Sequence, residues 1–359
     1  MIEEADRILG WDVGGANVKV APVACGRQAG PVLERAFALW REPDRLPSVL
    51  GEVADRVGHA PVMAVTMTAE LADCFATKRD GVRYVIDAFE RAFPATALWI
   101  YGVDGRFRSA AAARAQPHAV AAANWMASAT LVARTHRDAL FVDVGSTTTD
   151  IIPIVGGRVV ASGSTDRARL RSGELVYTGC LRTPVCAILR SVPLGGGRCR
   201  VAAEHFAVAA DAYRVLERIG DEDYTCDTPD GRGRGRVEAG ARLARMVCAD
   251  AETLGEEDVA AIAEHVVRTQ MRHIRHGLRQ VLRGLAPARP TAAVVAGCGA
   301  FLARAAAEAA GLTTWDLAAE VGEDAARSAP AAAVAFLLSE FCEGSDPSEG
   351  SDPSGAVTA

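Results

Sequence analysis

The alternation of hydrophobic and polar residues predicts a sheet and several helices in the first part of the chain. Two mainly apolar runs, 7–12 and 17–24, flank Gly14 and Gly15, a pattern typical of two strands joined by a glycine turn. Pro117 interrupts an Ala-rich stretch, so we expect two helices there instead of one. The other elements predicted in this part are a helix at 48–58, strands at 61–68 and 97–103, and helical segments at 83–93 and 108–134.

A second cycle of the same kind begins near residue 139. The apolar run 140–145 predicts a strand, and it is followed by STTTD, a second apolar run IIPIV, a Gly-Gly turn and the segment RVVASG. The order strand, glycine loop, strand therefore occurs twice, at 7–24 and at 139–162. Such an internal repeat indicates two similar halves, and we expect their glycine loops to face each other.

The remainder of the chain combines an irregular stretch with strong helical patterns. Residues 163–236 are the least regular part of the sequence. Helical patterns occur at 204–219, 237–253 and 256–284, and residues 291–310 have the pattern of a buried strand, a glycine turn and a helix. Strands and helices therefore alternate along most of the chain, which predicts an α/β fold.

These patterns divide the chain into two expected domains and a tail. A chain of 359 residues suits two domains, because single hydrophobic cores stop growing near ~250–300 residues. We place the first domain at 1–135 and the second at 136–340, with 163–236 as an irregular insertion in the second. Residues 343–359 are polar and contain EGSDPS twice, so we expect a disordered tail.

Composition and charge narrow the range of functions. The formal net charge is −6 and no block of like charges occurs, so a nucleic-acid partner is not expected. No apolar run reaches the ~18 residues of a membrane span, and the N-terminus lacks the order of a signal peptide. The nine cysteines include no CxxC pair, which is typical of reduced thiols. We therefore expect a cytoplasmic protein whose partners are small molecules, with self-association left open.

The first glycine loop is a candidate anion-binding site. Asp12 ends a hydrophobic strand, and Gly14 and Gly15 let the backbone approach a ligand closely. Asn17 and Lys19 follow within reach of a phosphate, and Asp12 could hold a metal ion through water. A plain hairpin with a capping aspartate would show the same residues, so this loop alone does not decide between the two interpretations.

The second glycine loop repeats the order of the first and adds hydroxyl groups. It runs from Asp143 to Asp150 and contains Gly145, Ser146, Thr147 and Thr148. Hydroxyls and amides at this density suit phosphate oxygens, although threonines also favour strands. A third glycine turn, at Gly297 and Gly299, lies between an apolar run and a helical pattern, where its amides could bind an anion or leave room for a nucleotide.

The three glycine segments in this order resemble the superfamily of actin, sugar kinases and heat-shock chaperones. The chain contains neither the GxxxxGK[ST] of a P-loop nor a GxGxxG in its first strand-turn, which argues against a P-loop protein and against a Rossmann enzyme. In the superfamily, two domains enclose a phosphorylated ligand, with an aspartate on each loop near magnesium. The resemblance implies a two-domain actin-like ATPase (ribonuclease H-like) fold with an interdomain cleft.

The resemblance narrows further, to one branch related to the hydantoinase/oxoprolinase group. It covers about residues 7–340, and its most specific parts are STTTDIIPI and GELVYTG. The branch accompanies tetrahydromethanopterin-linked one-carbon metabolism, and its archaeal member is a condensing enzyme of methanofuran biosynthesis. The other blocks that carry the resemblance are GWDVGGANVK, TMTAELADCF, AAANWMASA and EHFAVAADAYR.

The resemblance implies a transferase reaction with Mg²⁺. An aminomethylfuran-methyl group would pass from its diphosphate to the phenol oxygen of γ-glutamyltyramine, or of a tyrosine analogue, and diphosphate would be released. Asp12 and Asp143 would be catalytic, metal-associated carboxylates. A phenol of pKa ~10 needs a base or a nearby cation, and Asp150 and Glu70 are both candidate bases. The residues that would contact phosphate are Gly14, Gly15, Asn17, Lys19, Gly145, Ser146, Thr147, Thr148, Gly297 and Gly299.

Other polar residues are candidates for contact with the substrate. Glu174 and Tyr177, in the GELVYTG block, are placed to reach the acceptor, although a tyrosine here also suits a half-buried core. Glu204 and Asp211 are seven residues apart, so on one helix they would share a face and form an acidic wall for a metal ion or an ammonium group. Glu70 follows a strand end, where open α/β sheets place their ligands.

Two other functions fit the same three glycine segments. One is an ATP-dependent small-molecule kinase or a hydantoinase/oxoprolinase-like hydrolase, with ATP or another nucleotide as the cofactor beside Mg²⁺. The other is a nucleotide-binding regulatory or assembly protein that has no turnover. An assay of ATP hydrolysis beside an assay of diphosphate release separates these functions from the transferase.

Overall fold

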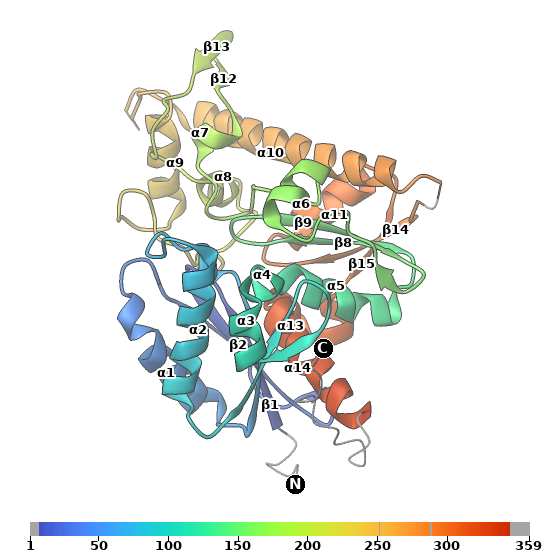
Figure 1. The fold of residues 1–359 in the computed structure, drawn as a ribbon. Helices are drawn as coiled ribbons and strands as arrows, with labels where there is room; N and C mark the ends of the chain where they lie inside the picture. Colours follow the sequence, from blue (N-terminus) through green and yellow to red (C-terminus); the bar gives the residue numbers. More distant parts are fainter. Residues whose placement is uncertain (1–6, 251, 288, 345–359) are drawn as a thin grey trace.

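The computed structural model describes residues 7–250, 252–287 and 289–344, and within them the chain forms two lobes around two mixed β-sheets (Figure 1). The strands of the first sheet are β1 (Arg7–Val13), β2 (Asn17–Ala24), β3 (Arg27–Gln28), β4 (Leu33–Ala36), β5 (Val62–Met67), β6 (Ala97–Tyr101) and β7 (Phe107–Ser109). Their order is β3-β2-β1-β5-β6-β7, with β4 beside β2. The helical segments of this part are η2 (Pro43–Arg45), α1 (Leu46–Val57), η3 (Ala69–Leu71), α2 (Lys78–Ala92), α3 (Ala110–Ala115) and α4 (Pro117–Val120).

The second lobe is built on a sheet of order β10-β9-β8-β14-β15, with β11 beside β9. Its strands are β8 (Ala139–Val144), β9 (Thr149–Val155), β10 (Arg158–Val159), β11 (Leu175–Val176), β14 (Ala292–Ala296) and β15 (Thr313–Asp316), and a separate hairpin pairs β12 (Ser191–Leu194) with β13 (Gly197–Arg200). The helices that follow these strands are α6 (Asp166–Ser172), α7 (Val185–Ile188), α8 (Ala209–Val215), α9 (Arg236–Arg245), α10 (Glu256–Gly284), α11 (Ala300–Glu308), α12 (Ala318–Val321) and α13 (Glu323–Arg327).

The repeat seen in the sequence is present in the strand pairing. In the first sheet, β1 pairs with β2 in antiparallel register, with Asp12 opposite Lys19, and β1 runs parallel to β5 on its other side. In the second sheet, β8 pairs with β9 in the same way, with Asp143 opposite Asp150, and runs parallel to β14. Each lobe therefore carries one glycine loop at the tip of an equivalent hairpin.

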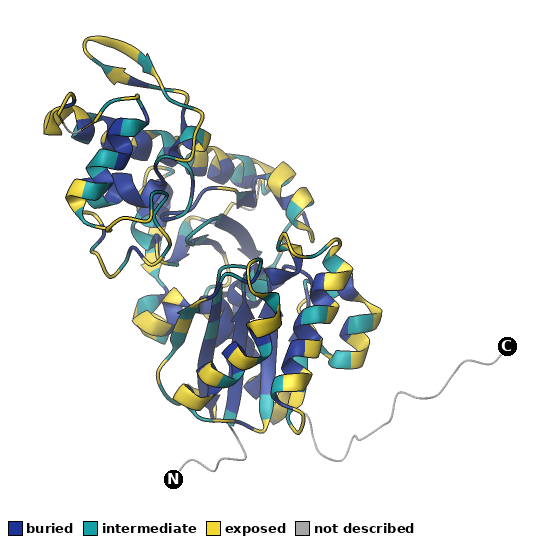
Figure 2. Cartoon of the chain, turned by 90° about the vertical axis from the view of Figure 1, so that its left-hand side faces the viewer, coloured by how far each residue is buried: buried dark blue, intermediate teal, exposed yellow. Residues whose placement is uncertain are grey.

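The central strands of both sheets are buried on both faces, and this explains the nearly continuous apolar runs of β1 and β8. Strands at the centre of each lobe are buried, whereas the outer sides of the helices are exposed (Figure 2). On one face of the first sheet, Leu9 and Trp11 pack with residues of α1 and α2, and the Trp11 ring meets Phe89 edge-on at 5.6 Å. The two sheets thus form rigid supports behind the glycine loops.

Two helices cross between the lobes, so the lobes do not follow the division at residue 135. Helix α5 (Asn124–Thr135) packs Trp125, Ala129 and Val132 against the second sheet. The C-terminal helix α14 (Ala329–Gly344) packs against β1 and β2 of the first sheet, and it also contacts α5. Helix α5, in the expected domain 1–135, thus packs on the second sheet as well as on the first, and α14, most of which falls in the expected domain 136–340, packs on the first sheet. Local sequence patterns do not reveal which sheet a helix covers.

Several helix boundaries also differ from the sequence expectation. Of the helix expected at 204–219, only Ala209–Val215 (α8) is helical, and the helix expected at 237–253 (α9) ends at Arg245. The interruption at Pro117 is confirmed, because α3 ends at Ala115 and α4 starts at the proline. Of the expected disordered tail, residues 345–359 lie outside the described residues, and α14 extends to Gly344.

The long helix α10 is strongly amphipathic. Its buried side includes Ile262, Val266 and Ile274, which belong to the core of the second lobe, and its outer side carries exposed Arg268, which pairs with Glu264 at 2.8 Å. No helix within the described ranges is both long enough and apolar enough to cross a membrane.

Gly10 allows α14 to lie directly on β1. An ideal Cβ built on Gly10 would collide with the carbonyl oxygen of Ala331 and would stand 2.7 Å from the Cβ of Ala335. We therefore expect Gly10→Ala to lower the free energy of unfolding by about 2–3 kcal/mol or more, because overpacking a buried contact forces the backbone to shift. Chemical denaturation measures this change.

The matched control is Gly51→Ala, within α1. Nothing lies within 4 Å of a Cβ built on Gly51, so this variant should gain roughly 0.5–1 kcal/mol from the better helix propensity of alanine. Equal stability of the two variants would contradict the close packing of α14 on β1.

Candidate active site

A cavity of about 790 Å³ opens between the two lobes, a size that suits a small-molecule site. Both glycine loops line it, together with the turn after β14, the loop after β5, helix α6 and the segment after β11. The predicted site residues that line it are Asp12, Gly14, Gly15, Asn17, Lys19, Glu70, Asp143, Gly145, Ser146, Thr147, Thr148, Asp150, Tyr177 and Gly297. The structure thus brings residues from distant parts of the chain to one cavity.

The first glycine loop closes the β1–β2 hairpin. The Gly14 amide donates to the Asn17 carbonyl oxygen at 2.9 Å, which shapes the turn. Asp12 is the second-last residue of β1 and is only 8% exposed, and one of its carboxylate oxygens, Oδ1, is buried without a hydrogen-bond partner. Burial raises the pKa of Asp12 to about 6, against the opposing effect of Lys19. An unpaired buried carboxylate oxygen of this kind favours a nearby cation or donor.

Asn17 and Lys19 share an acidic partner on the neighbouring strand. The Asn17 side-chain amide donates to Glu34 at 2.6 Å, and the Lys19 ammonium lies 3.9 Å from the same carboxylate. Burial lowers the pKa of Lys19, but Glu34 and Asp12 outweigh burial, so the pKa stands above its ordinary value. Lys19 is therefore a charged group at the cavity wall.

The second glycine loop is held by the segment that follows β11. The amide of Cys180 donates to the Gly145 carbonyl oxygen at 3.0 Å, and the amides of Leu181 and Arg182 donate to the Ser146 carbonyl oxygen at 3.1 and 2.9 Å. These contacts give the residues directly after the GELVYTG block a structural role next to the loop. The half-buried side chains of Ser146 and Thr147 line the cavity.

Asp143 lies beside this loop and close to the carboxylate of the first loop. Burial raises the pKa of Asp143 to about 7, and the charges of Asp150 and Asp12 raise it further while Lys19 lowers it. The charge of Asp12, on the first loop, thus contributes to the raised pKa of Asp143 on the second. A divalent cation would stabilise the charged form of the two carboxylates, and the lysine suits a phosphorylated ligand.

The third glycine turn packs directly behind Asp143. Gly297 has a φ of 87°, and a Cβ built on it would collide with the Asp143 carboxylate, so only glycine fits there. The Gly299 amide donates to the Val144 carbonyl oxygen at 2.8 Å. Gly297 and Cys298 line the cavity, whereas Gly299 is buried behind it. The turn therefore shapes the second loop as well as the cavity.

A chain of charges crosses from the first lobe to the second at one end of the cavity. The Lys78 ammonium lies 3.4 Å from Glu70 and 3.1 Å from Asp166 in α6. Arg169 then lies 3.7 Å from Asp166 and forms a close ion pair with Asp150. The Arg169 guanidinium also stacks over an indole ring and is almost fully buried.

The two candidate bases differ in what they contact. Burial raises the pKa of Glu70 and the pKa of Asp150, while Lys78 lowers the first and Arg169 lowers the second. Glu70 is 1% exposed, and its Oε2 has no hydrogen-bond partner. Asp150, in contrast, is occupied by Arg169.

Of the four predicted substrate residues, Tyr177 lines the cavity, whereas Glu174, Glu204 and Asp211 do not. Glu174 is buried, and its carboxylate accepts from the backbone amides of Ser162 and Gly163 at 2.5 and 3.1 Å. It therefore holds the loop after β10 in place. Tyr177, from the same block, lines the cavity with 67% of its surface exposed, so it is not the half-buried core tyrosine that the sequence also allowed.

The predicted acidic wall of Glu204 and Asp211 is wrong. Glu204 is exposed in the loop before α8, so the two residues share no helical face. Asp211 is completely buried, where it pairs with Arg242 at 2.8 Å and accepts from the Tyr224 hydroxyl at 2.9 Å. The seven-residue spacing failed because the helix begins five residues later than the sequence pattern indicated.

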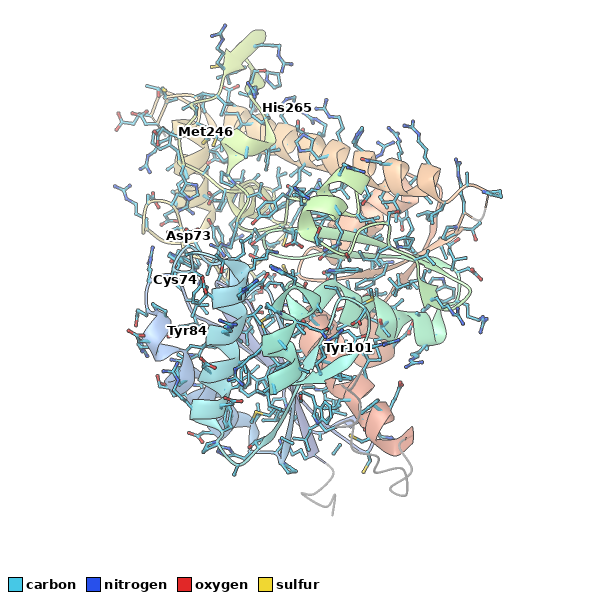
Figure 3. All side chains as sticks on the ribbon, viewed as in Figure 1. Asp73, Cys74, Tyr84, Tyr101, Met246 and His265 are labelled. Atoms are coloured by element: carbon cyan, nitrogen blue, oxygen red, sulfur yellow. The ribbon has the colours of Figure 1, made fainter. Side chains whose placement is uncertain are left out.

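Several cavity residues were not predicted from the sequence. Glu34 lies on a short strand of alternating polarity, which gives no chemical signal. Trp40 faces the Arg182 guanidinium at 5.5 Å and belongs to an irregular connection. Asp166 follows the capping residue Thr165, so the sequence around it indicates only a helix start. Asp73 lies in the loop after β5, at the side of the first lobe that faces the second, and it is labelled in Figure 3.

The two sheets and their paired hairpins define an α/β protein with the two-lobed, actin-like ATPase fold. Among solved structures, the fold is similar to that of nucleotide-free acetone carboxylase, with a TM-score of 0.51 and 9% identity over 92% of this chain and 69% of that chain. Residues 62–341 match the hydantoinase/oxoprolinase family, and the chain belongs to that family.

Curated relatives place the chain more closely. It is 37% identical over 277 residues, 77% of this chain and 82% of the relative, to the (4-{4-[2-(gamma-L-glutamylamino)ethyl]phenoxymethyl}furan-2-yl)methanamine synthase of Methanocaldococcus jannaschii. A protein of the same name from Methanococcus vannielii is 39% identical over 127 residues, which are 35% of this chain and 57% of that protein. The chain is a member of this synthase family.

Proposed function

We propose that the enzyme forms an aryl ether bond in the biosynthesis of a methanofuran-type cofactor. It transfers an aminomethylfuran-methyl group from its diphosphate to the phenol oxygen of γ-glutamyltyramine, or of a tyrosine analogue, and releases diphosphate. The observation that carries the proposal is the pair Asp12 and Asp143, held between two loops rich in amides and hydroxyls. The name of the 37% identical relative describes a product with this phenoxymethylfuran linkage.

The loops suit the leaving group. Mg²⁺, when bound, supplies charge to stabilise the departing diphosphate. Asp12 and Asp143 are the residues that would hold it, and the unpaired Oδ1 of Asp12 fits that role. The described residues contain no group of three or more His, Cys, Asp and Glu that could hold a metal by itself. Two carboxylates completed by substrate phosphates is the arrangement that Mg²⁺ commonly adopts.

The residues of the loops complete the diphosphate site. Lys19 adds a positive charge at the cavity wall, and Ser146, Thr147 and Thr148 present hydroxyl groups to phosphate oxygens. The hairpin turns hold the loop backbone in place, since the Gly14 amide donates to the Asn17 carbonyl oxygen and the Gly145 amide to the Thr148 carbonyl oxygen, each at 2.9 Å. The loop amides therefore need little rearrangement when charge develops on the leaving oxygen. The loop pair thus acts on a leaving diphosphate and performs no ATP hydrolysis in this reaction.

Glu70 is the better placed of the two candidate bases. Its free Oε2 can accept the phenol proton, whereas the Asp150 carboxylate is held by Arg169. The phenol oxygen forms a bond to the furan-bearing CH₂ as the bond from that carbon to the diphosphate oxygen breaks. The proton passes to Glu70, and its raised pKa brings it closer to the pKa of the phenol.

Apolar side chains at the mouth of the cavity suit an aromatic acceptor. Leu71 of the first lobe is 63% exposed, and Leu170 and Tyr177 of the second are 48% and 67% exposed. Large apolar side chains that stay exposed beside a cavity are typical of a ligand site. They line the same cavity as Glu70, and Leu71 directly follows Glu70 in the chain, so a phenol ring held among them would share the cavity with the proposed base.

The test is an assay of diphosphate release with the purified enzyme, the furan-methyl diphosphate, γ-glutamyltyramine and Mg²⁺. We expect release that needs both substrates and the metal ion, and no ATP consumption in a parallel assay. Release that does not depend on the acceptor would contradict the transfer. ATP hydrolysis stimulated by a small molecule would support a kinase or hydrolase instead.

Lys78 offers a test of the role of Glu70 that does not remove the base. Because the Lys78 ammonium lowers the pKa of Glu70, Lys78→Met should raise that pKa further. Glu70 must be deprotonated to accept a proton, so the acid limb of kcat should move to higher pH. Arg79→Met, on the same turn of α2, is the control and should leave the limb in place, whereas an unmoved limb in Lys78→Met would contradict the assignment of Glu70.

A further inference from the structure

Two cysteine thiols meet beside the cavity, and the proposed reaction uses neither of them. The Sγ atoms of Cys180 and Cys298 are 3.1 Å apart, although the two residues are 118 positions apart in the sequence. Cys180 belongs to the segment that follows β11, and Cys298 to the glycine turn that follows β14. Cys180 is completely buried, whereas Cys298 is exposed and lines the cavity.

The backbone on both sides of this thiol pair is fixed by hydrogen bonds to the second glycine loop. The Cys180 amide donates to the Gly145 carbonyl oxygen at 3.0 Å, and the Gly299 amide donates to the Val144 carbonyl oxygen at 2.8 Å. The fold thus holds the thiols together without help from a flexible segment. A disulfide has sulfurs about 2.05 Å apart, which is about 1 Å closer than the sulfurs of these two thiols.

We propose that Cys180 and Cys298 form a peroxide-reactive dithiol that closes to an intramolecular disulfide. Cys298, which is open to the cavity, attacks one oxygen of a peroxide, and the O–O bond breaks to give a sulfenic acid and water. The Cys180 sulfur then attacks the sulfenic sulfur, the S–O bond breaks, and a second water leaves with the thiol proton. Overall, two thiols lose two electrons and two protons, and hydrogen peroxide is reduced to two waters.

The geometry separates this pair from the other cysteines. Cys226 is the rival partner, because its charge also raises the pKa of Cys180, but no contact at hydrogen-bond distance joins those two sulfurs among the described residues. Cys25, in the turn between β2 and β3, is exposed as Cys298 is, but no contact to another thiol is found for it among the described residues. A reaction governed by exposure would therefore modify both Cys25 and Cys298, whereas one governed by the pair would link Cys298 to Cys180.

The experiment treats the reduced full-length protein with a small excess of hydrogen peroxide, alkylates the remaining thiols, and maps the unreduced peptides by mass spectrometry. We expect one linked peptide pair that contains Cys180 and Cys298, and a fall from nine free thiols by two. Dithiothreitol should restore all of them. Cys298→Ser should lose the linked pair, and Cys25→Ser should keep it.

Three results would overturn the proposal. They are a bridge from Cys180 to Cys226, irreversible oxidation of Cys298 without a linked peptide, and equal modification of Cys25 and Cys298 as single thiols. The map of the unaltered protein decides the question even where Cys298→Ser does not fold. The outcome is independent of the proposed transfer reaction, because no substrate is present.

Discussion

Asp143→Asn is expected to lower turnover by about 10³-fold or more while the protein stays folded. The variant keeps the size of the side chain but removes the charge that faces Asp12 and Lys19 across the cavity. A preorganised charge that acts on the leaving group contributes several kcal/mol to the barrier. Steady-state release of diphosphate measures the loss, and circular dichroism confirms the fold. Near-native turnover in the presence of Mg²⁺ would remove Asp143 from the mechanism.

The same variant should be more stable than the parent protein in the absence of ligand. Burial raises the pKa of Asp143 from 3.8 to about 7, so the folded state keeps a proton that the unfolded chain releases. The stability of the parent protein therefore falls as pH rises from about 4 through about 7. Asparagine avoids this loss, and we expect on the order of 1–3 kcal/mol of added stability at pH 8, or about 2–6 °C in Tm.

Asp227→Asn is the matched control for these measurements. Asp227 is exposed, lies outside the cavity lining and stands 4.0 Å from Arg41, which stays charged from pH 5 to pH 8, so the variant should change neither turnover nor the pH dependence of Tm. Thermal melts from pH 5 to pH 8 compare the three proteins. A Tm of Asp143→Asn that falls below that of the parent protein at every pH would show that Asp143 has a stabilising role that burial does not explain.

Glu70→Gln is expected to lower kcat by about 10²–10⁴-fold, the usual contribution of a general base. Glutamine keeps the shape and a contact to Lys78, so folding should be retained. The acid limb of the pH profile should disappear with the titrating carboxylate, whereas loss of a purely structural contact would leave that limb in place. Full pH profiles of kcat with saturating substrates make the distinction.

Glu52→Gln is the matched control for Glu70→Gln. Glu52 lies on α1 and pairs with Arg35 at 2.6 Å, outside the cavity lining. It should keep both the rate and the profile of the parent protein. If Glu70→Gln retains kcat and its acid limb, Asp150 becomes the stronger candidate for the base.

The loops could be predicted from the sequence because short-range patterns encode them. An aspartate at the end of an apolar strand, followed by glycine and a second strand, predicts a tight hairpin wherever it occurs. Since this pattern appears twice, the sequence also predicts two equivalent positions, near Asp12 and Asp143. The third turn was predicted because Gly297 and Gly299 stand between an apolar run and a helical pattern. The structure explains the glycine, since the positive φ of Gly297 and its close approach to Asp143 exclude larger residues.

The rest of the cavity depends on contacts between distant segments. Glu34 and Trp40 reach it through the path of the chain after β2, and Asp166 through the placement of α6 beside Lys78. None of these follows from local patterns. Asp211 shows the converse error, because an acidic residue that seemed free for a substrate is neutralised inside the lobe by Arg242.

Oxygen labelling tests the proposed alkyl transfer to the phenol oxygen most directly. The acceptor γ-glutamyltyramine is prepared with ¹⁸O in its phenol and is incubated with the furan-methyl diphosphate, Mg²⁺ and the enzyme. We predict that the label appears in the ether product and that the released diphosphate carries none. Label in a phosphorylated acceptor, or in the released diphosphate, would contradict transfer to the phenol oxygen.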